Sequence, residues 1–423
     1  LGNTQTKGQA LAVLSEVARI PTHLYHFLSY AESLGAGWGR KFKRSVGNWF
    51  TNTNVDKLGY HAIKYKQRDG WAMRDVLRLA HPNPTTGSDP TFRAALYKWI
   101  VDNAKISEQV PRIVQAATDL ATCSDFKQAV ALIKEHKLPH EAVPNELKSN
   151  PEVWAAMLES GMPMNAMVRN LAKMTSIGLL APMSVYTQEV CKRLSSKEYI
   201  SGSRLHPIAI LKALGTYAQG HGDKGKLFWT PVGAINNALD EAFYLAFDNV
   251  VPTNKRTGLF LDVSGSMTSP APGMSMSCMQ VSAAMAMVTA HTEPVHQFWG
   301  FGADLKEIDI SKKDRLSTVI DKMRRINMGS TDCALPFTEA IKNKWGIDTF
   351  AVYTDNETNH GNSLQPSVAF QKYKKHTGID ARSVVVAMEP YNFSIADPTD
   401  STMLDIAGMS TDVPAVISEF ALS

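Results

Sequence analysis

The chain has 423 residues, of which 44% are hydrophobic and 20% are charged, and its net charge is +4. This length exceeds what one compact core usually organises, so two or three domains are expected. The sequence contains no uninterrupted apolar run of about 18 residues and no signal-like N-terminus, which argues against a membrane span and against secretion. Four distant cysteines without a C-x-x-C pair predict free thiols in a reducing compartment, and we expect a cytoplasmic protein; they are Cys123, Cys191, Cys278 and Cys333.

Charge is distributed unevenly along the chain. Residues 1–250 carry 29 Lys and Arg against 21 Asp and Glu, a net +8, whereas residues 251–423 carry 15 against 19, a net −4. Between Arg40 and Arg78 there are only three acidic residues, so this stretch is typical of a surface that binds a polyanion. Its ten basic residues are Arg40, Lys41, Lys43, Arg44, Lys57, Lys64, Lys66, Arg68, Arg74 and Arg78.

Residues 1–250 show helical periodicity, interrupted by clusters of Pro, Gly, Asn and Ser. Pairs of these helices would give units of about 40 residues, a spacing typical of a HEAT-like helical-repeat domain, although an irregular all-helical domain is the alternative. The predicted helices cover residues 13–30, 91–104, 125–137, 153–160, 164–174 and 206–220.

Residues 251–423 change to short β-branched or aromatic runs that alternate with helical patterns. Strands are predicted at 258–263, 295–301, 349–354 and 383–388, and helices near 276–290, 314–325, 333–344 and 366–376. This alternation predicts an α/β domain with a doubly wound, mostly parallel sheet. Ligands of such sheets bind at the carboxyl ends of the strands.

Asp262, Ser264 and Ser266 follow the first of these strands in the pattern Asp-x-Ser-x-Ser. The G-x-S-x-G pattern of a nucleophile elbow is not met, because the first glycine is missing. An aspartyl-phosphate enzyme is also disfavoured, because Ser264 stands where it would need a second carboxylate. One carboxylate and two hydroxyls instead suit Mg²⁺ or Mn²⁺. Thr331 and Asp355 follow in two later loops and supply further oxygens. The alternative is that these residues only cap helices.

In order and spacing, these five residues resemble the metal-ion-dependent adhesion site of von Willebrand factor A domains. Many proteins contain such a domain, so the function must be inferred from the helical half of the chain, residues 1–250. The segment "HAIKYKQRDGWAMRDVLRLAHPNP" (61–84) resembles the Ro autoantigen family, in which a TROVE domain precedes an A domain. Further similar segments extend over nearly the whole chain: "SEVARIPTHLYHFL", "VRNLAKM", "RLHPIAILKALGTYAQGHG", "GKLFW", "YTDNET" and "SIADPTDSTMLDIAG".

The resemblance implies a TROVE domain at 1–250, an A domain at 251–423, and a ring of helical repeats closed by the A domain. It implies that small non-coding Y RNAs bind on the basic outer surface and that single-stranded 3′ ends of misfolded RNAs enter the ring, with an exoribonuclease as a possible partner. On the same analogy, Lys64, Arg68 and His81 contact RNA. The resemblance also implies additional helices at the start of family members, so we expect this chain to be a shortened member or a fragment, or to lack its first repeats.

The residues themselves support a basic surface in this region. Lys64 and Arg68, with Gln67 beside them, are expected as i,i+4 neighbours on one helix. Arg74, Arg78 and His81 are expected on one face of the next helix, opposite an apolar stripe. Solvated lysines and arginines are the alternative for any one of these positions, and Tyr65 is left undecided between packing and stacking on a base. For His206, His221 and Trp71, packing is the preferred interpretation.

Three functions compete. The first is a non-catalytic RNA-binding scaffold in RNA quality control. The second is a metal-dependent protein-interaction module, in which a partner carboxylate completes the cation site. The third, a hydrolase acting through the metal, is the least favoured because no general base accompanies the site.

Overall fold

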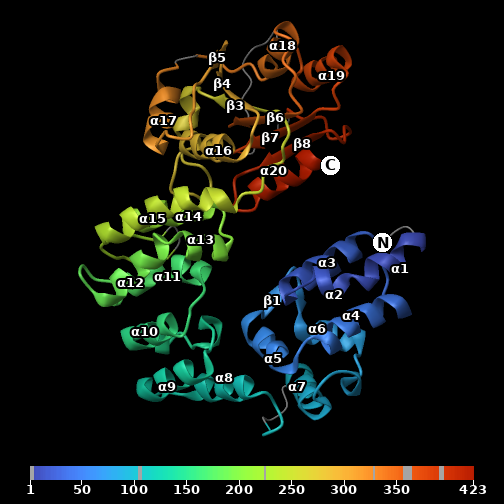
Figure 1. The fold of residues 1–423 in the computed structure, drawn as a ribbon, viewed down its shortest axis with the longest axis vertical. Helices are drawn as coiled ribbons and strands as arrows, with labels where there is room; N and C mark the ends of the chain where they lie inside the picture. The colour runs from blue at the N-terminus through green and yellow to red at the C-terminus, as the bar shows by residue number, and fades with distance from the viewer. Residues whose placement is uncertain (1–3, 103–106, 223–224, 327–328, 356–363, 390–394) are drawn as a thin grey trace. The chain divides into compact units, whose positions relative to one another are not determined.

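The computed structural model describes residues 4–102, 107–222, 225–326, 329–355, 364–389 and 395–423. The chain divides into two compact units, Leu1–Met162 and Pro163–Ser423 (Figure 1). The domain boundary expected near residue 250 stays a prediction. Residues 356–358 of the "YTDNET" segment and Ser394 lie outside the described residues. Among the helices of the described part, none has the length and apolarity needed to cross a membrane.

In its described residues the first unit contains helices and one short hairpin, and buried aliphatic and aromatic side chains between Leu11 and Val114 form one core cluster. Its elements are α1 Thr4–Ala12, α2 Leu14–Val17, α3 Pro21–Ser33, α4 Arg40–Asn52, α5 Val55–Lys64, β1 Gln67–Arg68, β2 Trp71–Ala72, α6 Met73–Ala80, α7 Pro90–Asp102, α8 Arg112–Thr122, α9 Phe126–His136 and α10 Pro151–Glu159, with 3₁₀ turns η1 Pro84–Thr86, η2 His140–Ala142 and η3 Leu147–Ser149.

The single helix predicted over residues 13–30 is wrong, because the chain forms two helices there. Ile20 is extended, with φ −139° and ψ 160°, and Pro21 begins α3. A residue that precedes proline is driven out of the helical region by contact with the proline ring, so the break lies where the sequence places this proline.

The second unit joins a helical part to an α/β part. The helical part comprises α11 Met164–Ser176, α12 Val185–Leu194, α13 Lys197–Ser203, α14 Pro207–Ala218, α15 Gly233–Leu245 and η4 Ala246–Asn249. The α/β part comprises β3 Thr257–Asp262, η5 Gly265–Thr268, α16 Cys278–Thr292, β4 His296–Phe301, β5 Leu305–Glu307, α17 Leu316–Arg324, α18 Leu335–Lys342, β6 Thr349–Thr354, α19 Pro366–Thr377, β7 Arg382–Ala387, β8 Met403–Ala407 and α20 Val413–Leu422.

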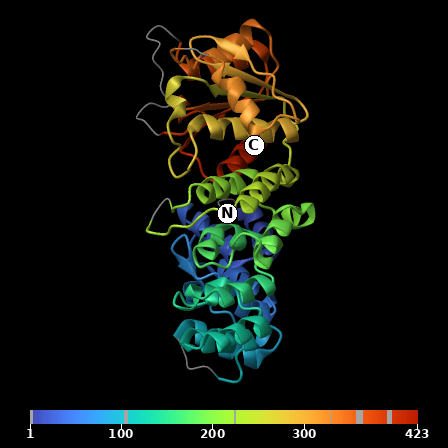
Figure 2. The same cartoon turned by 90° about the vertical axis from the view of Figure 1, so that its left-hand side faces the viewer.

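The sheet has the strand order β5-β4-β3-β6-β7-β8, and every pair is parallel except β4 with β5. Successive side chains of a strand point to opposite faces. Phe260 and Phe350 therefore pack with Phe337 of α18 and Phe370 of α19 on one face. Leu259 faces the other side, which α16 and α20 cover side by side (Figures 1 and 2). The four predicted strands and the mostly parallel sheet are confirmed, whereas β5, β8 and α20 were not predicted.

Arg93, on α7, is fully buried and connects three segments of the first unit. Its guanidinium donates hydrogen bonds to the carbonyl oxygens of Phe50 at 2.6 Å, Thr53 at 3.0 Å and Ser88 at 3.1 Å. The planar fork of donors suits this set of acceptors. Arg93 thereby fixes the end of α4 and the loop before α7 to one another.

We expect Arg93→Met to lower the free energy of unfolding by at least about 3 kcal/mol, because it leaves buried carbonyl oxygens without donors. Arg112→Met, at an exposed position on α8, is the matched control and should change stability by less than about 0.5 kcal/mol. Urea unfolding monitored by circular dichroism measures both. Equal midpoints for the two variants would show that Arg93 does not hold these segments together.

Candidate functional site

Asp262 is the last residue of β3, the strand paired on both sides with parallel neighbours, and its side chain is fully buried. One carboxylate oxygen accepts a hydrogen bond from the Ser264 backbone N–H at 2.8 Å, and the other accepts one from the Thr354 hydroxyl at 2.7 Å. Burial raises the pKa of Asp262 to about 6 against the effect of these hydrogen bonds, and the charge of Asp355 raises it further. The strand therefore ends on a carboxylate whose negative charge is poorly compensated by the protein.

The hydroxyls of the Asp-x-Ser-x-Ser loop lie beside this carboxylate. Ser264 is buried, and its Oγ lies 3.0 Å from the Oγ of Ser266. Thr331 is also buried, in a loop that is fixed to the end of β4 by a hydrogen bond from the Asp332 N–H to the Gly302 carbonyl at 2.9 Å. Because β4 neighbours β3, Thr331 belongs to the same carboxyl edge of the sheet.

Asp355 follows β6, the other neighbour of β3, and is 3% exposed. Its Oδ1 atom is buried and accepts no hydrogen bond from the described residues. Nearby, the pKa of the Cys278 thiol is raised to about 11, first by burial and then by the negative charges of Glu389, Asp355 and Asp262. Glu389, which sequence analysis missed, is thus a third carboxylate at this edge. It stands two residues after β7, where the rule that ligands gather at strand ends could have found it.

These observations test whether the residues fit a divalent cation. Two buried carboxylates, one with an unsatisfied oxygen, and a pair of adjacent hydroxyls form the hard-oxygen set that Mg²⁺ prefers. In the described part of the chain no three His, Cys, Asp or Glu side chains are grouped so as to hold a metal, so a cation here would need the hydroxyls. The residues fit the ion, and the assignment of Asp262, Ser264, Ser266, Thr331 and Asp355 as its ligands stays a prediction.

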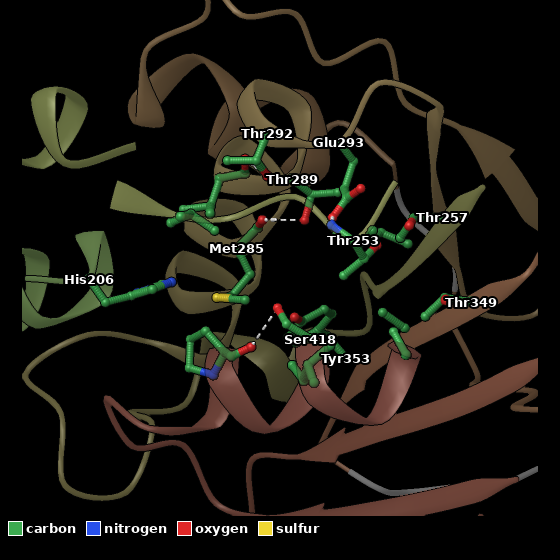
Figure 3. A pocket seen from close by; sticks show the side chains of 17 residues that line it. His206, Thr253, Thr257, Met285, Thr289, Thr292, Glu293, Thr349, Tyr353 and Ser418 are labelled. Atoms are coloured by element: carbon green, nitrogen blue, oxygen red, sulfur yellow. Dashed lines mark hydrogen bonds between the residues drawn. The ribbon is translucent and has the colours of Figure 1, made fainter. Parts of the chain in front are cut away.

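A separate cavity of about 50 Å³ lies at the amino ends of β3 and β6, away from this edge (Figure 3). Thr257 and Thr349 line it from the sheet, and Ser418 lines it from α20. His206, expected to be packed, points into it from the start of α14 and accepts a hydrogen bond from the Ile208 N–H at 3.2 Å. Burial lowers the pKa of His206 to about 4, so at neutral pH this ring carries no charge for ligand binding.

The predicted RNA-binding residues occupy a different local structure from the one expected. α5 ends at Lys64, so the single helix carrying both Lys64 and Arg68 is wrong. Gln67 and Arg68 form β1, and the hairpin turns at Asp69 and Gly70, both with positive φ. An Asp-Gly pair favours this two-residue turn, so the signal was present in the sequence. We call residues 64–81 the basic segment.

In the second half of the basic segment the helix, its apolar stripe and its exposed arginines agree with expectation, whereas His81 lies just beyond the helix. α6 buries Met73, Val76, Leu77 and Ala80 and leaves Arg74 and Arg78 exposed. His81 follows as the exposed C-cap residue in the left-handed region, and Trp71 is buried. Within the described residues, none of the ten basic side chains between Arg40 and Arg78 forms an ion pair with a carboxylate. No ion pair with a described carboxylate therefore competes with a ligand for these side chains.

Comparison with known proteins identifies the family. A model of the TROVE domain matches residues 2–138 and 135–215, and a model of the Ro60 vWA domain matches residues 256–421. The chain belongs to the Ro60 family. The RNA-binding protein RO60 of Caenorhabditis elegans is 36% identical over 97% of this chain and 72% of its own length. That of Deinococcus radiodurans is 38% identical over 99% of this chain and 78% of its own length.

The crystal structure of the Deinococcus radiodurans RO (RSR) protein is also similar, with a TM-score of 0.84 and 37% identity over all of this chain and 84% of that one. Membership of the Ro60 family explains why a helical region precedes an A-type α/β domain in this chain. The resemblance stated from the sequence is confirmed for both parts.

In this Ro60-family chain, His61 lies buried under the basic segment. Its ring stacks on Trp49 at 6.2 Å and meets Tyr65 edge-on at 5.5 Å, and its Nδ1 has no hydrogen-bond partner among the described residues. Burial, with the charges of Lys57 and Lys64, lowers the pKa of His61 to about 4. The folded protein therefore holds this histidine neutral.

Because the folded pKa lies below the ordinary histidine value of 6.5, His61 supports full stability above pH 6.5, and this stability is lost as pH falls toward 4. We expect wild type to lose about 3 kcal/mol more than His61→Leu between pH 7 and pH 4. Urea unfolding of both proteins across this range measures the difference, in which other titrating groups cancel. Parallel pH profiles would contradict a neutral buried His61.

Proposed function

We propose that this protein is a non-catalytic RNA-binding protein whose basic segment binds the phosphates of small structured RNA. The observation that carries the proposal is the set of exposed cations in residues 64–81 that form no ion pair with a carboxylate of the described residues. Such side chains bind polyanions because they displace counterions from the phosphates. The relatives named RNA-binding protein RO60 support the same ligand class.

The finer proposal is that the RNA is a Y or Y-like non-coding RNA and that 3′ ends of misfolded RNAs occupy a ring cavity, in RNA quality control. Lys64, Gln67, Arg68, Arg74, Arg78 and His81 are the proposed contacts. Arg68 and Arg74 are the best placed to grip phosphate bidentately, since both are exposed and neither forms an ion pair with a described residue. An exoribonuclease is a proposed partner, and RNA should survive incubation with the purified protein and Mg²⁺.

We expect Arg68→Ala combined with Arg74→Ala to weaken binding of a structured RNA and to flatten its salt dependence. Each lost phosphate contact should reduce the slope of log affinity against log salt by about 0.7 to 0.9. Lys372→Ala, at an exposed lysine of α19, is the control and should leave the slope unchanged. Filter binding between 50 and 200 mM salt, a range of about two salt doublings, measures the slopes. Equal slopes in all three proteins would place the RNA elsewhere.

We also propose that the carboxyl edge of the sheet binds Mg²⁺ or Mn²⁺ through Asp262, Ser264, Ser266, Thr331 and Asp355. The unpartnered buried oxygen of Asp355 favours this proposal. A bound cation that leaves one coordination position for a partner carboxylate would make the domain a metal-dependent protein-interaction module.

A cation that binds only the folded state stabilises it. We expect MnCl₂ at roughly 100 times its dissociation constant to stabilise wild type by about 2.7 kcal/mol and to raise its melting temperature. Asp262→Asn should lose this rise, whereas Asp309→Asn, at an exposed position after β5, should keep it. Calorimetry with and without metal decides. If metal still raises the melting temperature of Asp262→Asn, the cation does not bind at this edge.

A further inference from the structure

The cavity at the amino ends of β3 and β6 is lined by both polar and apolar side chains. It lies between the sheet, α16, α20 and His206, the N-cap residue of α14, and its volume is about 50 Å³ (Figure 3). A buried water needs about 10 to 15 Å³ of such volume, so the cavity has room for about four non-hydrogen atoms. Its apolar walls include Leu259, Met285, Val288 and Ile417. The donors and acceptors among the polar groups determine which small molecule fits.

His206 presents a hydrogen-bond donor to this cavity. Its Nδ1 accepts the Ile208 N–H at 3.2 Å, so Nδ1 carries no proton. Burial lowers the pKa of His206 to about 4, so the ring is neutral at pH 7 and its single proton resides on Nε2. Nε2 is buried and has no hydrogen-bond partner among the described residues, and the ring points into the cavity (Figure 3). An N–H group that lacks an acceptor is therefore directed at the cavity.

Other residues of the lining present acceptors. The Ser418 hydroxyl of α20 donates its hydrogen to the Pro414 carbonyl at 3.1 Å, and the Thr289 hydroxyl of α16 donates to the Met285 carbonyl at 3.1 Å (Figure 3). A hydroxyl that donates in this way keeps a lone pair for a second partner. Thr349 of β6 is 2% exposed, and its Oγ1 has no hydrogen-bond partner among the described residues. The lining therefore offers one N–H donor and several hydroxyl oxygens.

The charges of the lining favour a neutral ligand. The carboxylate of Glu293 is buried in the wall, where it accepts the backbone N–H groups of Thr253 at 2.7 Å and Asn254 at 3.0 Å. Its negative charge repels an anion, and none of the described lining residues is a lysine or arginine that could offset it. A cation such as an amidinium carries no acceptor for the His206 N–H. A neutral molecule with one acceptor avoids both conflicts.

We propose that this cavity binds a small neutral molecule that carries a primary carboxamide group. The amide oxygen accepts the His206 N–H, and the amide NH₂ group donates to hydroxyl oxygens of the lining, with Ser418 and Thr349 as the proposed partners. An alcohol has a single donor and satisfies fewer of these oxygens. Water would leave molecules against the apolar walls without polar partners. The site is independent of the RNA and metal sites proposed above.

Three isosteric probes test the charge and the hydrogen-bond pattern: acetamide, acetate and acetamidinium. In the full chain labelled with ¹³C-methyl methionine, the NMR signal that is lost in Met285→Leu identifies the reporter in the cavity wall. Acetamide should shift this signal with a dissociation constant on the order of millimolar, and the two ions should bind at least about tenfold more weakly. Equal binding of all three, or no binding of acetamide because the cavity holds only water, would overturn the proposal.

Substitution of one proposed partner locates the amide. Ser418→Ala removes an acceptor and should weaken acetamide binding by about threefold to tenfold. Ser201→Ala is the matched control, because this exposed hydroxyl of α13 also donates to the carbonyl four residues earlier, that of Lys197. The control should bind acetamide as wild type does. If Ser418→Ala also binds acetamide as wild type does, the amide does not bind in the proposed way.

Substitution of the donor tests the role of His206. His206→Phe removes the Nε2–H and should abolish the preference for acetamide over acetamidinium, whereas His221→Phe, at an exposed histidine, should keep it. A preference that persists in His206→Phe would contradict the proposed contact. His206→Phe also removes the acceptor of the Ile208 N–H. If this variant does not fold, the comparison of Ser418→Ala with Ser201→Ala decides.

Discussion

The main physical constraint on the α/β part of this protein is a carboxylate that is buried at the end of its central strand. β3 is paired on both sides, so its last side chain, Asp262, is fully buried where the chain must turn into a loop. The carboxylate is satisfied locally by the Ser264 N–H and across the sheet by the Thr354 hydroxyl. These two bonds fix the loop after β3 to the end of β6, so any ligand at this edge meets a preformed site.

Two buried carboxylates at one strand edge, Asp262 and Asp355, repel each other without a compensating charge, and the charge of Asp355 raises the pKa of Asp262. The charges of Asp262, Asp355 and Glu389 also raise the pKa of the Cys278 thiol. Hydrogen bonds lower the pKa of Asp262 but do not cancel the cost of its burial. A divalent cation would supply positive charge here and a partner for the buried Asp355 oxygen at once, so the proposed oxygen set suits a metal better than a helix cap.

The sequence predicted the parts of the fold that have a strong local pattern. The apolar runs of β3, β4, β6 and β7 are fully or largely buried, so their composition identifies them. β5 is a three-residue edge strand with exposed residues, and β8 is an edge strand of mostly intermediate burial, so neither has a distinctive pattern. The positions of Asp262, Thr331 and Asp355 after strands are visible in the sequence, which is why they could be proposed as ligands. Glu389 follows β7 in the same way, but no serine or threonine beside it marks the position.

The structure of the basic segment differs from what its local spacing predicts. Spacing placed Lys64 and Arg68 on one helix, but the Asp69-Gly70 turn ends the helical pattern and sends Arg68 into a hairpin. The aromatic contacts of Lys64 also change what a substitution there means. Loss of its amine would release Tyr60 and Tyr65 as well as remove a charge. Weaker RNA binding after such a change would therefore not identify Lys64 as a direct contact, whereas the exposed Arg68 permits that conclusion.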